Sequence, residues 1–200
     1  MQRTINLRIP YDKDIVDTLE SATFAYNEAC RTGFDNRVKN KNKLHHLVYY
    51  HIRESHPELP SDLVCQQIRR ACESLSAVKF HHCPFGKNLY ARYTRNTCTY
   101  FGSTHILSIS TINGRKKIPI EIPEWARTRY DGWKFVNIGV SYRKGRLTVH
   151  FVIGHDTPEP KGDRVLGLDR GIINIVTCSD NSFYNSKHLK NVKGRYQHLK

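Results

Sequence analysis

The chain has 200 residues, 38% of them hydrophobic, which is enough to bury the core of one or two domains. Lys and Arg number 32 against 18 Asp and Glu, a formal net charge of +14. We therefore expect a polyanionic partner such as nucleic acid, because neutralised phosphates release condensed counterions. No apolar run reaches the roughly 18 to 20 residues of a membrane span, and no signal-peptide segment opens the chain. These features predict a cytoplasmic protein without a membrane partner and leave the oligomeric state open.

The six cysteines are scattered along the chain and form no Cys-x-x-Cys pair. Because a zinc ribbon needs paired ligands at close spacing, no zinc ribbon is expected here. The cluster His81-His82-Cys83 could contribute to a metal site, but no second cluster of ligands accompanies it. Reduced structural thiols are the favoured interpretation of the cysteines.

The first predicted element is a half-buried strand over residues 3–9, where apolar and polar residues alternate. The period then changes to three and four, which predicts a helix from 12 to about 31 that ends near Gly33. A polar, basic loop over 34–43 follows, and its side chains either contact phosphates or are simply solvated. Its basic residues are Arg37, Lys39, Lys41 and Lys43.

Two more helices are expected before the pattern changes. Apolar residues from Leu44 to Ile52 predict the second helix, which stops before Pro57. The third runs from about residue 60 to 80, with Ser61 as the expected N-cap. Its apolar stripe predicts a core face, while the basic residues of its other face are available to RNA or DNA. These are Arg69, Arg70 and Lys79.

The region from 83 to 158 is rich in short β-prone runs. Asn113-Gly114 is a strong hairpin-turn signal, and Arg143-Lys144-Gly145 separates the two best alternating runs. Such a series of antiparallel strands predicts a small β-barrel. Because one strand precedes the helices, the helical segment is expected to be inserted into this barrel. The predicted strands are 89–93, 98–101, 105–109, 138–142 and 147–153.

Aromatic and basic residues interleave in the same region. Aromatic faces can stack unpaired bases while Arg and Lys neutralise phosphates, although barrel core is the more frequent fate of a single aromatic. As a set, these residues favour nucleic-acid binding. The candidates are Tyr90, Arg92, Arg95, Arg127, Arg129 and Lys134.

A Pro-containing polar stretch, 157–162, predicts a stiff linker. An apolar run then leads to Asp169, and a second run over 172–177 completes a predicted hairpin; Asp180-Asn181 supplies a turn before a third strand at Phe183-Tyr184. A carboxylate on an apolar strand needs an explanation, because burying an unpaired charge is costly. Three remain open: a tie to a turn, an ion pair with Arg164 or Arg170, and a Mg²⁺ site.

The stretch 165–180 reads Val-Leu-Gly-Leu-Asp-Arg-Gly-Ile-Ile-Asn-Ile-Val-Thr-Cys-Ser-Asp. It resembles the first RuvC (RNase H-like) segment of TnpB proteins, the OrfB-type proteins of IS200/IS605-family insertion elements and relatives of the Cas12 nucleases. The order of helices and strands extends the likeness over nearly the whole chain. The resemblance implies an α+β protein: a wedge-like β-barrel (1–10 and 83–158), an inserted recognition-like helical lobe (11–82) and the first hairpin of an incomplete RuvC domain (164–200).

The resemblance also implies an activity, RNA-guided DNA cleavage with guide RNA and target DNA as partners. Asp169 would be the first of three carboxylates that bind two Mg²⁺ ions for phosphodiester hydrolysis. The family's second and third acids, a Glu and an Asp, have no counterpart here, so we expect a truncated copy with no nuclease activity alone. The alternative is a non-catalytic RNA- or DNA-binding protein.

Overall fold

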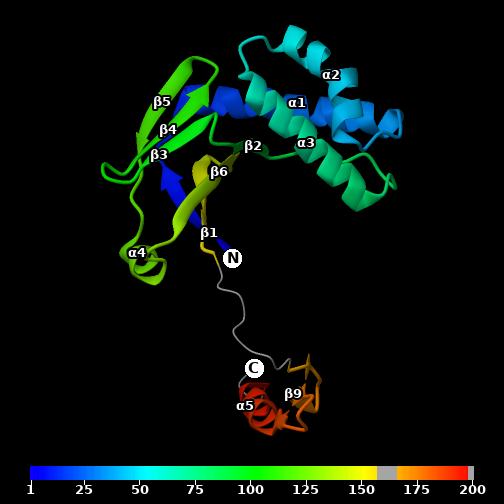
Figure 1. The fold of residues 1–200 in the computed structure, drawn as a ribbon, viewed down its shortest axis with the longest axis vertical. Helices are drawn as coiled ribbons and strands as arrows, with labels where there is room; N and C mark the ends of the chain where they lie inside the picture. The colour runs from blue at the N-terminus through cyan, green and yellow to red at the C-terminus, as the bar shows by residue number, and fades with distance from the viewer. Residues whose placement is uncertain (157–165, 198–200) are drawn as a thin grey trace. The chain divides into compact units, whose positions relative to one another are not determined.

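The computed structural model describes residues 1–156 and 166–197 and divides the chain after Asp156 into two compact units. We name residues 1–156 unit 1 and residues 166–197 unit 2. Both combine helices with antiparallel strands (Figure 1), which confirms the α+β class. The predicted linker at 157–162 lies outside the described residues, as do Asp163 and Arg164.

Unit 1 begins with a strand, continues with three helices and ends with strands interrupted by a short helix. Its elements are β1 (Gln2–Ile9), α1 (Lys13–Asp35), α2 (Lys41–Ser55), α3 (Ser61–Val78), β2 (Leu89–Tyr93), β3 (Cys98–Phe101), β4 (Ile106–Thr111), β5 (Gly114–Pro119), α4 (Glu124–Arg129), β6 (Lys134–Arg143) and β7 (Arg146–Gly154).

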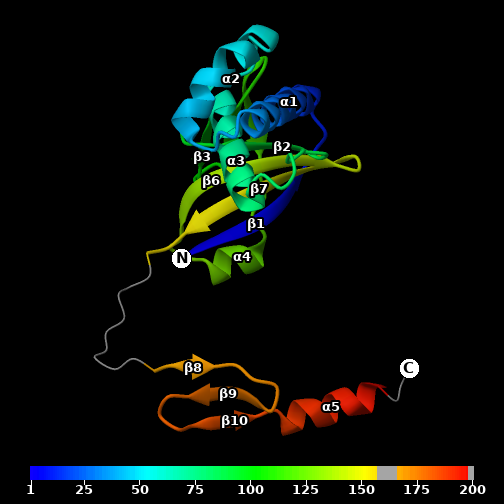
Figure 2. The same cartoon turned by 90° about the vertical axis from the view of Figure 1, so that its right-hand side faces the viewer.

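A four-stranded antiparallel sheet in the order β1-β7-β6-β2 supports the rest of unit 1 (Figure 2). Along β1, Ile5, Leu7 and Ile9 are buried and the residues between them are exposed, as the alternation predicts. Ile5 pairs with Phe151 of β7, whose alternate residues are buried on the same face. Because β1 and β2 belong to one sheet, the three helices are inserted between two of its strands.

Helices α1 and α3 pack against each other and against β2 (Figure 1). The α1 stripe that includes Leu19 and Ala22 is fully buried, as its spacing predicts. Asp12 is the N-cap of α1, because its side chain accepts a hydrogen bond from the Ile15 amide at 3.2 Å. Asp62, in the first turn of α3, accepts a 2.7 Å hydrogen bond from the Thr94 hydroxyl and so joins the helices to the β2–β3 turn.

Three helix boundaries differ from the predicted ones. Helix α1 continues past Gly33 to Asp35, and Gly33 is needed for close packing: a Cβ there would lie 2.5 Å from the Leu75 Cδ1 of α3. The N-cap of α3 is Pro60, without a side-chain cap, so the Ser61 prediction is wrong. Lys41 and Lys43 belong to α2, because Asn40 caps that helix by accepting hydrogen bonds from the amides of Asn42 and Lys43.

The remaining strands of unit 1 form a separate three-stranded sheet in the order β3-β4-β5. The Asn113-Gly114 and Arg143-Lys144-Gly145 turns are where they were predicted, at the β4–β5 and β6–β7 hairpins. Among the described strands, no pairing closes these sheets into the expected barrel. Strand β2 is an edge of the main sheet and packs against α1 and α3, whereas β3, which begins at Cys98, pairs with β4 of the second sheet.

Unit 2 contains β8 (Leu168–Asp169), β9 (Asn174–Cys178), β10 (Phe183–Asn185) and α5 (Lys187–Gln197). The strands form an antiparallel sheet in the order β10-β9-β8, so the predicted hairpin and third strand are present. The second strand starts two residues later than predicted, at Asn174. Ile172 and Ile173 precede it in a bend, because the Ser186 hydroxyl hydrogen-bonds to both of their carbonyl oxygens.

Candidate nucleic-acid interface

The strand-rich part of unit 1 carries its positive charge. The helical segment 11–82 contains ten basic and ten acidic residues, whereas residues 1–10 and 83–156 contain fourteen basic and four acidic ones. Of those fourteen, Arg92 and Lys116 form ion pairs. The other twelve are exposed and make no ion pair within the described residues. This surface is therefore attractive to a polyanion.

One group of predicted residues meets where α3 faces β2. The Arg70 guanidinium lies between two aromatic rings, 4.1 Å from the centre of Tyr26 and 4.6 Å from that of Tyr90. Tyr90 in turn lies across the backbone of Gly139 on β6, where a Cβ would come within 2.5 Å of the Tyr90 hydroxyl. Such cation–π stacking holds Arg70 and Tyr90 in fixed positions.

Arg92 belongs to the same group but is already paired. Its guanidinium donates two hydrogen bonds of 3.0 Å to the carboxylate of Glu73 on α3. This contact lowers the pKa of the Glu73 carboxyl and raises the pKa of Arg92, so both groups stay charged at neutral pH. Arg69, one residue before Arg70, is exposed and makes no ion pair among the described residues. Compared with the paired Arg92, Arg69 is therefore more available to bind a phosphate.

The face of the main sheet opposite the core is polar. A hollow of about 660 Å³ lies on it, bordered by Arg3, Tyr90 and Arg92. His150 connects three strands there: its Nε2 lies 2.9 Å from the Ser141 hydroxyl and its Nδ1 lies 2.8 Å from the Asn6 side-chain oxygen. Burial lowers the pKa of His150 below its ordinary 6.5, so the ring is neutral at pH 7.

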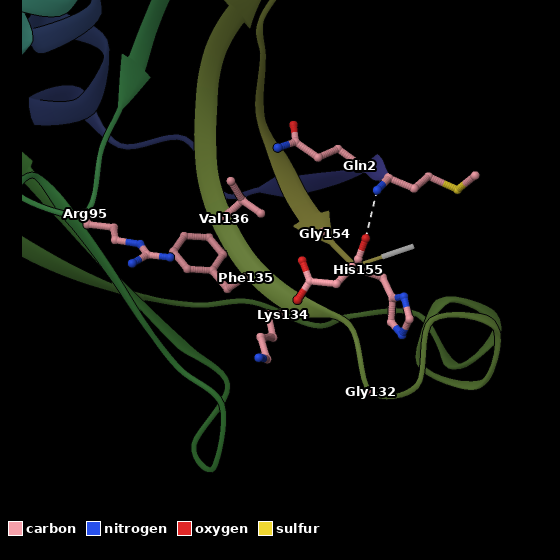
Figure 3. A pocket seen from close by; sticks show the side chains of 10 residues that line it. Gln2, Arg95, Gly132, Lys134, Phe135, Val136, Gly154 and His155 are labelled. Atoms are coloured by element: carbon pink, nitrogen blue, oxygen red, sulfur yellow. Dashed lines mark hydrogen bonds between the residues drawn. The ribbon is translucent and has the colours of Figure 1, made fainter. Parts of the chain in front are cut away.

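Arg95 and Lys134, predicted from separate stretches of sequence, border one hollow of about 380 Å³ (Figure 3). Arg95 follows β2 and Lys134 begins β6. The Phe135 ring and His155 complete the same rim, and the amino group of Met1 donates a 2.8 Å hydrogen bond to the His155 carbonyl. The structure therefore brings the two predicted cations and an aromatic ring together with the Met1 amino group and the Asp156 carboxylate at the end of the sheet.

Arg127 and Arg129 both lie on α4 but border different hollows. Arg127 borders one with His105, and Arg129 borders a second, of about 530 Å³, with Arg3 and Trp133. Both arginines are exposed. The two predicted arginines thus do not share a hollow.

The predicted residues of the helical segment form a separate group at the α1–α2 connection. Arg37 lies 5.7 Å from the ring centres of both Phe34 and Phe80, which places the end of α3, with Lys79, beside this connection. Lys39, Lys41 and Lys43 are exposed on the same connection and on the first turn of α2. They form a second basic patch, distinct from the strand-rich surface.

One basic cluster was not among the predicted site residues. Arg143, Lys144 and Arg146 surround the β6–β7 turn, where the sequence indicated only a hairpin. Arg8 lies at the same end of the sheet, because it pairs with Thr148 two residues after Arg146. All four are exposed and make no ion pair in the described part of the chain. The sequence feature that could have identified this cluster is the presence of three basic residues around a two-residue turn.

Asp169 is exposed on β8, in register with Thr177 of β9. Within the described residues its carboxylate makes no hydrogen bond and no ion pair, so the structure shows neither a tie to a turn nor a pair with Arg170. Asp180 does hold a turn, since its carboxylate accepts a 2.9 Å hydrogen bond from the Ser182 amide. No group of three His, Cys, Asp or Glu side chains in residues 1–156 and 166–197 is placed to hold a metal ion.

Comparison of the sequence with protein-family models and with curated proteins finds no match. Among the described helices, none combines the length and hydropathy that crossing a bilayer requires. All six cysteines are free thiols.

Proposed function

We propose that this chain is a nucleic-acid-binding protein of the TnpB-like kind, with guide RNA and target DNA as its partners. Binding takes place mainly on the strand-rich part of unit 1. The observation that carries this proposal is the set of twelve exposed basic residues without an acidic partner in the described residues. A merely solvated surface would mix its charges, as the helical segment does with ten of each sign.

The arrangement of aromatic rings supports single-stranded or distorted nucleic acid among the ligands. Tyr90 is held by Arg70, and Phe135 lies beside Arg95 and Lys134. Rings next to cations stack bases while the cations neutralise phosphates. In the TnpB-like interpretation, the two sheets of unit 1 correspond to the wedge-like barrel and the helices to the recognition-like lobe.

Mg²⁺-dependent cleavage belongs to the same proposal through Asp169, which would be a metal ligand. The described residues do not form a complete site for it, because one exposed carboxylate cannot hold a pair of ions. The lone carboxylate favours the second candidate function, an RNA- or DNA-binding protein that does not cut.

Binding is tested by fluorescence anisotropy with labelled RNA and duplex DNA between about 50 and 200 mM salt. The triple variant Arg143→Gln, Lys144→Gln, Arg146→Gln should reduce the slope of log affinity against log salt by about 2 to 3. The matched control is Lys187→Gln, Lys190→Gln, Lys193→Gln on α5, which removes the same charge from unit 2 and should leave the slope nearly unchanged. An affinity that does not change with ionic strength would refute the proposal. An equal effect of the control variant would refute the assignment of the binding surface to unit 1.

Cleavage is tested by incubating the chain with Mg²⁺, RNA and labelled DNA. We expect uncut DNA, with or without the substitution Asp169→Ala. Cutting by the unchanged chain that Asp169→Ala abolishes would establish the nuclease and exclude the non-catalytic alternative.

A further inference from the structure

An aromatic pocket of about 370 Å³ lies between α4 with its following turn and the inner face of the main sheet. Its volume falls within the range of small-molecule sites, roughly 300 to 1,000 Å³. Gly132 and Phe135, labelled in Figure 3, line both this pocket and the hollow that Arg95 and Lys134 border. The pocket is thus part of the cationic end of the sheet, and none of the predicted site residues except Arg127 lines it.

The walls of the pocket are flat rings in fixed mutual orientations. Tyr100 meets Phe151 edge to face at 4.9 Å, and Phe135 lies 5.0 Å from Phe151. Tyr130 and Trp133, which also line the pocket, meet at 5.0 Å between ring centres. Rings that are locked by their neighbours offer a rigid slot for another planar group.

Polar groups gather at one end of this slot. The Tyr100 hydroxyl lies 3.0 Å from Nδ1 of His105. His105 has a left-handed backbone, with φ of 52°, and its carbonyl accepts a 2.9 Å hydrogen bond from the Ile120 amide. An uncommon conformation of a non-glycine residue persists where the surroundings determine it, often beside a binding site. Asp131 adds a carboxylate to the pocket lining.

Cations line two hollows that share residues with the pocket. Arg127 lines the pocket together with His105 and also borders the hollow beyond. Tyr130 and Trp133 are shared with the second hollow, which contains Arg3 and Arg129. A base within a strand has a phosphate on each side, and cations in two separate neighbouring hollows fit such a ligand.

We infer that this pocket holds one unpaired base of a single-stranded nucleic acid, stacked between the aromatic walls, with its flanking phosphates at Arg127 on one side and at Arg3 and Arg129 on the other. The inference rests on the proposed nucleic-acid binding and adds a class of ligand, a base free of its partner. The hydroxyl of Tyr100, His105 and Asp131 provide donors and acceptors for the edge of the base.

The test compares two tryptophans, because the chain has only two. Trp133→Leu removes a pocket wall, and the matched control Trp125→Leu removes a ring that is 58% exposed and outside the pocket lining. Stacking of one base predicts that Trp133→Leu weakens binding of a short uridine oligonucleotide by about 5- to 150-fold. Trp125→Leu should change it by less than about twofold. Blunt duplex DNA should bind all three proteins equally, since no charge changes.

A second measurement leaves the pocket intact. In the Trp125→Phe protein, Trp133 is the remaining tryptophan, and the uridine oligonucleotide should quench its fluorescence. An abasic oligonucleotide with the same phosphates should not. Equal quenching by both, or equal effects of Trp133→Leu and Trp125→Leu, would overturn the inference while salt-dependent duplex binding preserved the proposed function. If the unchanged chain bound neither the oligonucleotide nor the duplex, the proposed function itself would be refuted.

Discussion

Unit 1 and unit 2 use the same kinds of elements but differ in what they bury. In unit 1, aliphatic and aromatic side chains such as Leu19, Ile68 and Phe151 are almost completely removed from water. In the described residues of unit 2, only Cys178 and Ser186 are buried, and Ile172 is 86% exposed. The comparison teaches that a hydrogen-bonded sheet and a helix do not by themselves constitute a core.

Local hydrogen bonds hold unit 2 in its conformation. The Ser186 hydroxyl bridges the carbonyls of Ile172 and Ile173, and the Ser179 hydroxyl accepts a 2.9 Å hydrogen bond from the Gly167 amide. Each contributes about 1 kcal/mol. Unit 1 adds to such contacts a continuous set of buried apolar residues, which is the larger source of stability.

The largest expected difference between the units is in hydrogen exchange. We expect amides in α1, β6 and β7 to exchange at least about a thousandfold more slowly than those in β9 and α5, because a domain core supports an opening free energy of about 5 kcal/mol or more. Hydrogen exchange of the unchanged chain, followed by mass spectrometry, measures this difference in rate. Equal protection of the amides in both units would contradict the view that unit 1 alone has a substantial core.

A pair of alanine substitutions gives the next largest effect. Leu19→Ala, at a fully buried site, should lower the free energy of unfolding by about 2 to 5 kcal/mol. Its matched control Ile172→Ala, at an exposed site of unit 2, should change it by less than about 0.5 kcal/mol. Urea denaturation followed by circular dichroism provides both values. A cost at Ile172 as large as that at Leu19 would show that unit 2 has a core of its own.

The smallest expected effect is on acid stability. Hydrogen bonds from Lys116 and Asn113 hold the pKa of the Asp14 carboxyl below 3.8, and they join α1 to the β4–β5 hairpin. Because the folded state lowers this pKa, the stabilisation is fully present above pH 3.8 and is lost as the pH falls through the folded value. Asp14→Asn should therefore make the melting temperature of unit 1 depend less steeply on pH in the acidic range.

The control for Asp14 is Asp180, whose pKa is also lowered, by the Ser182 hydroxyl and amide within one turn of unit 2. Asp180→Asn should leave the melting of unit 1 unchanged at every pH. If both substitutions alter that melting profile alike, the Asp14 contact does not connect the elements of unit 1 in the way described.

The candidate interface was only partly predictable from sequence. Interleaved rings and cations in the sequence pointed to Arg95 and Lys134, both of which are exposed, but their common hollow depends on how β2 and β6 pair. The pairing of Arg92 with Glu73 joins residues from a helix and a strand, so no local pattern reveals it. The basic residues of the β6–β7 turn were not predicted as site residues, because the same stretch of sequence was interpreted as a hairpin turn.

From the sequence alone, helices α1 to α3, most of the strands, the hairpin turns and the excess of positive charge could be predicted, because hydrophobic period, turn residues and charge are local properties. Helices α4 and α5 and strand β5 were not predicted. Only the tertiary structure decided that the strands form open sheets, that Gly33 lies inside a helix against Leu75, and that Tyr100 and Trp133 line one pocket. Each of these depends on which distant elements meet. A periodic pattern shows that a face is apolar, whereas its partner is selected by the packing of the whole core.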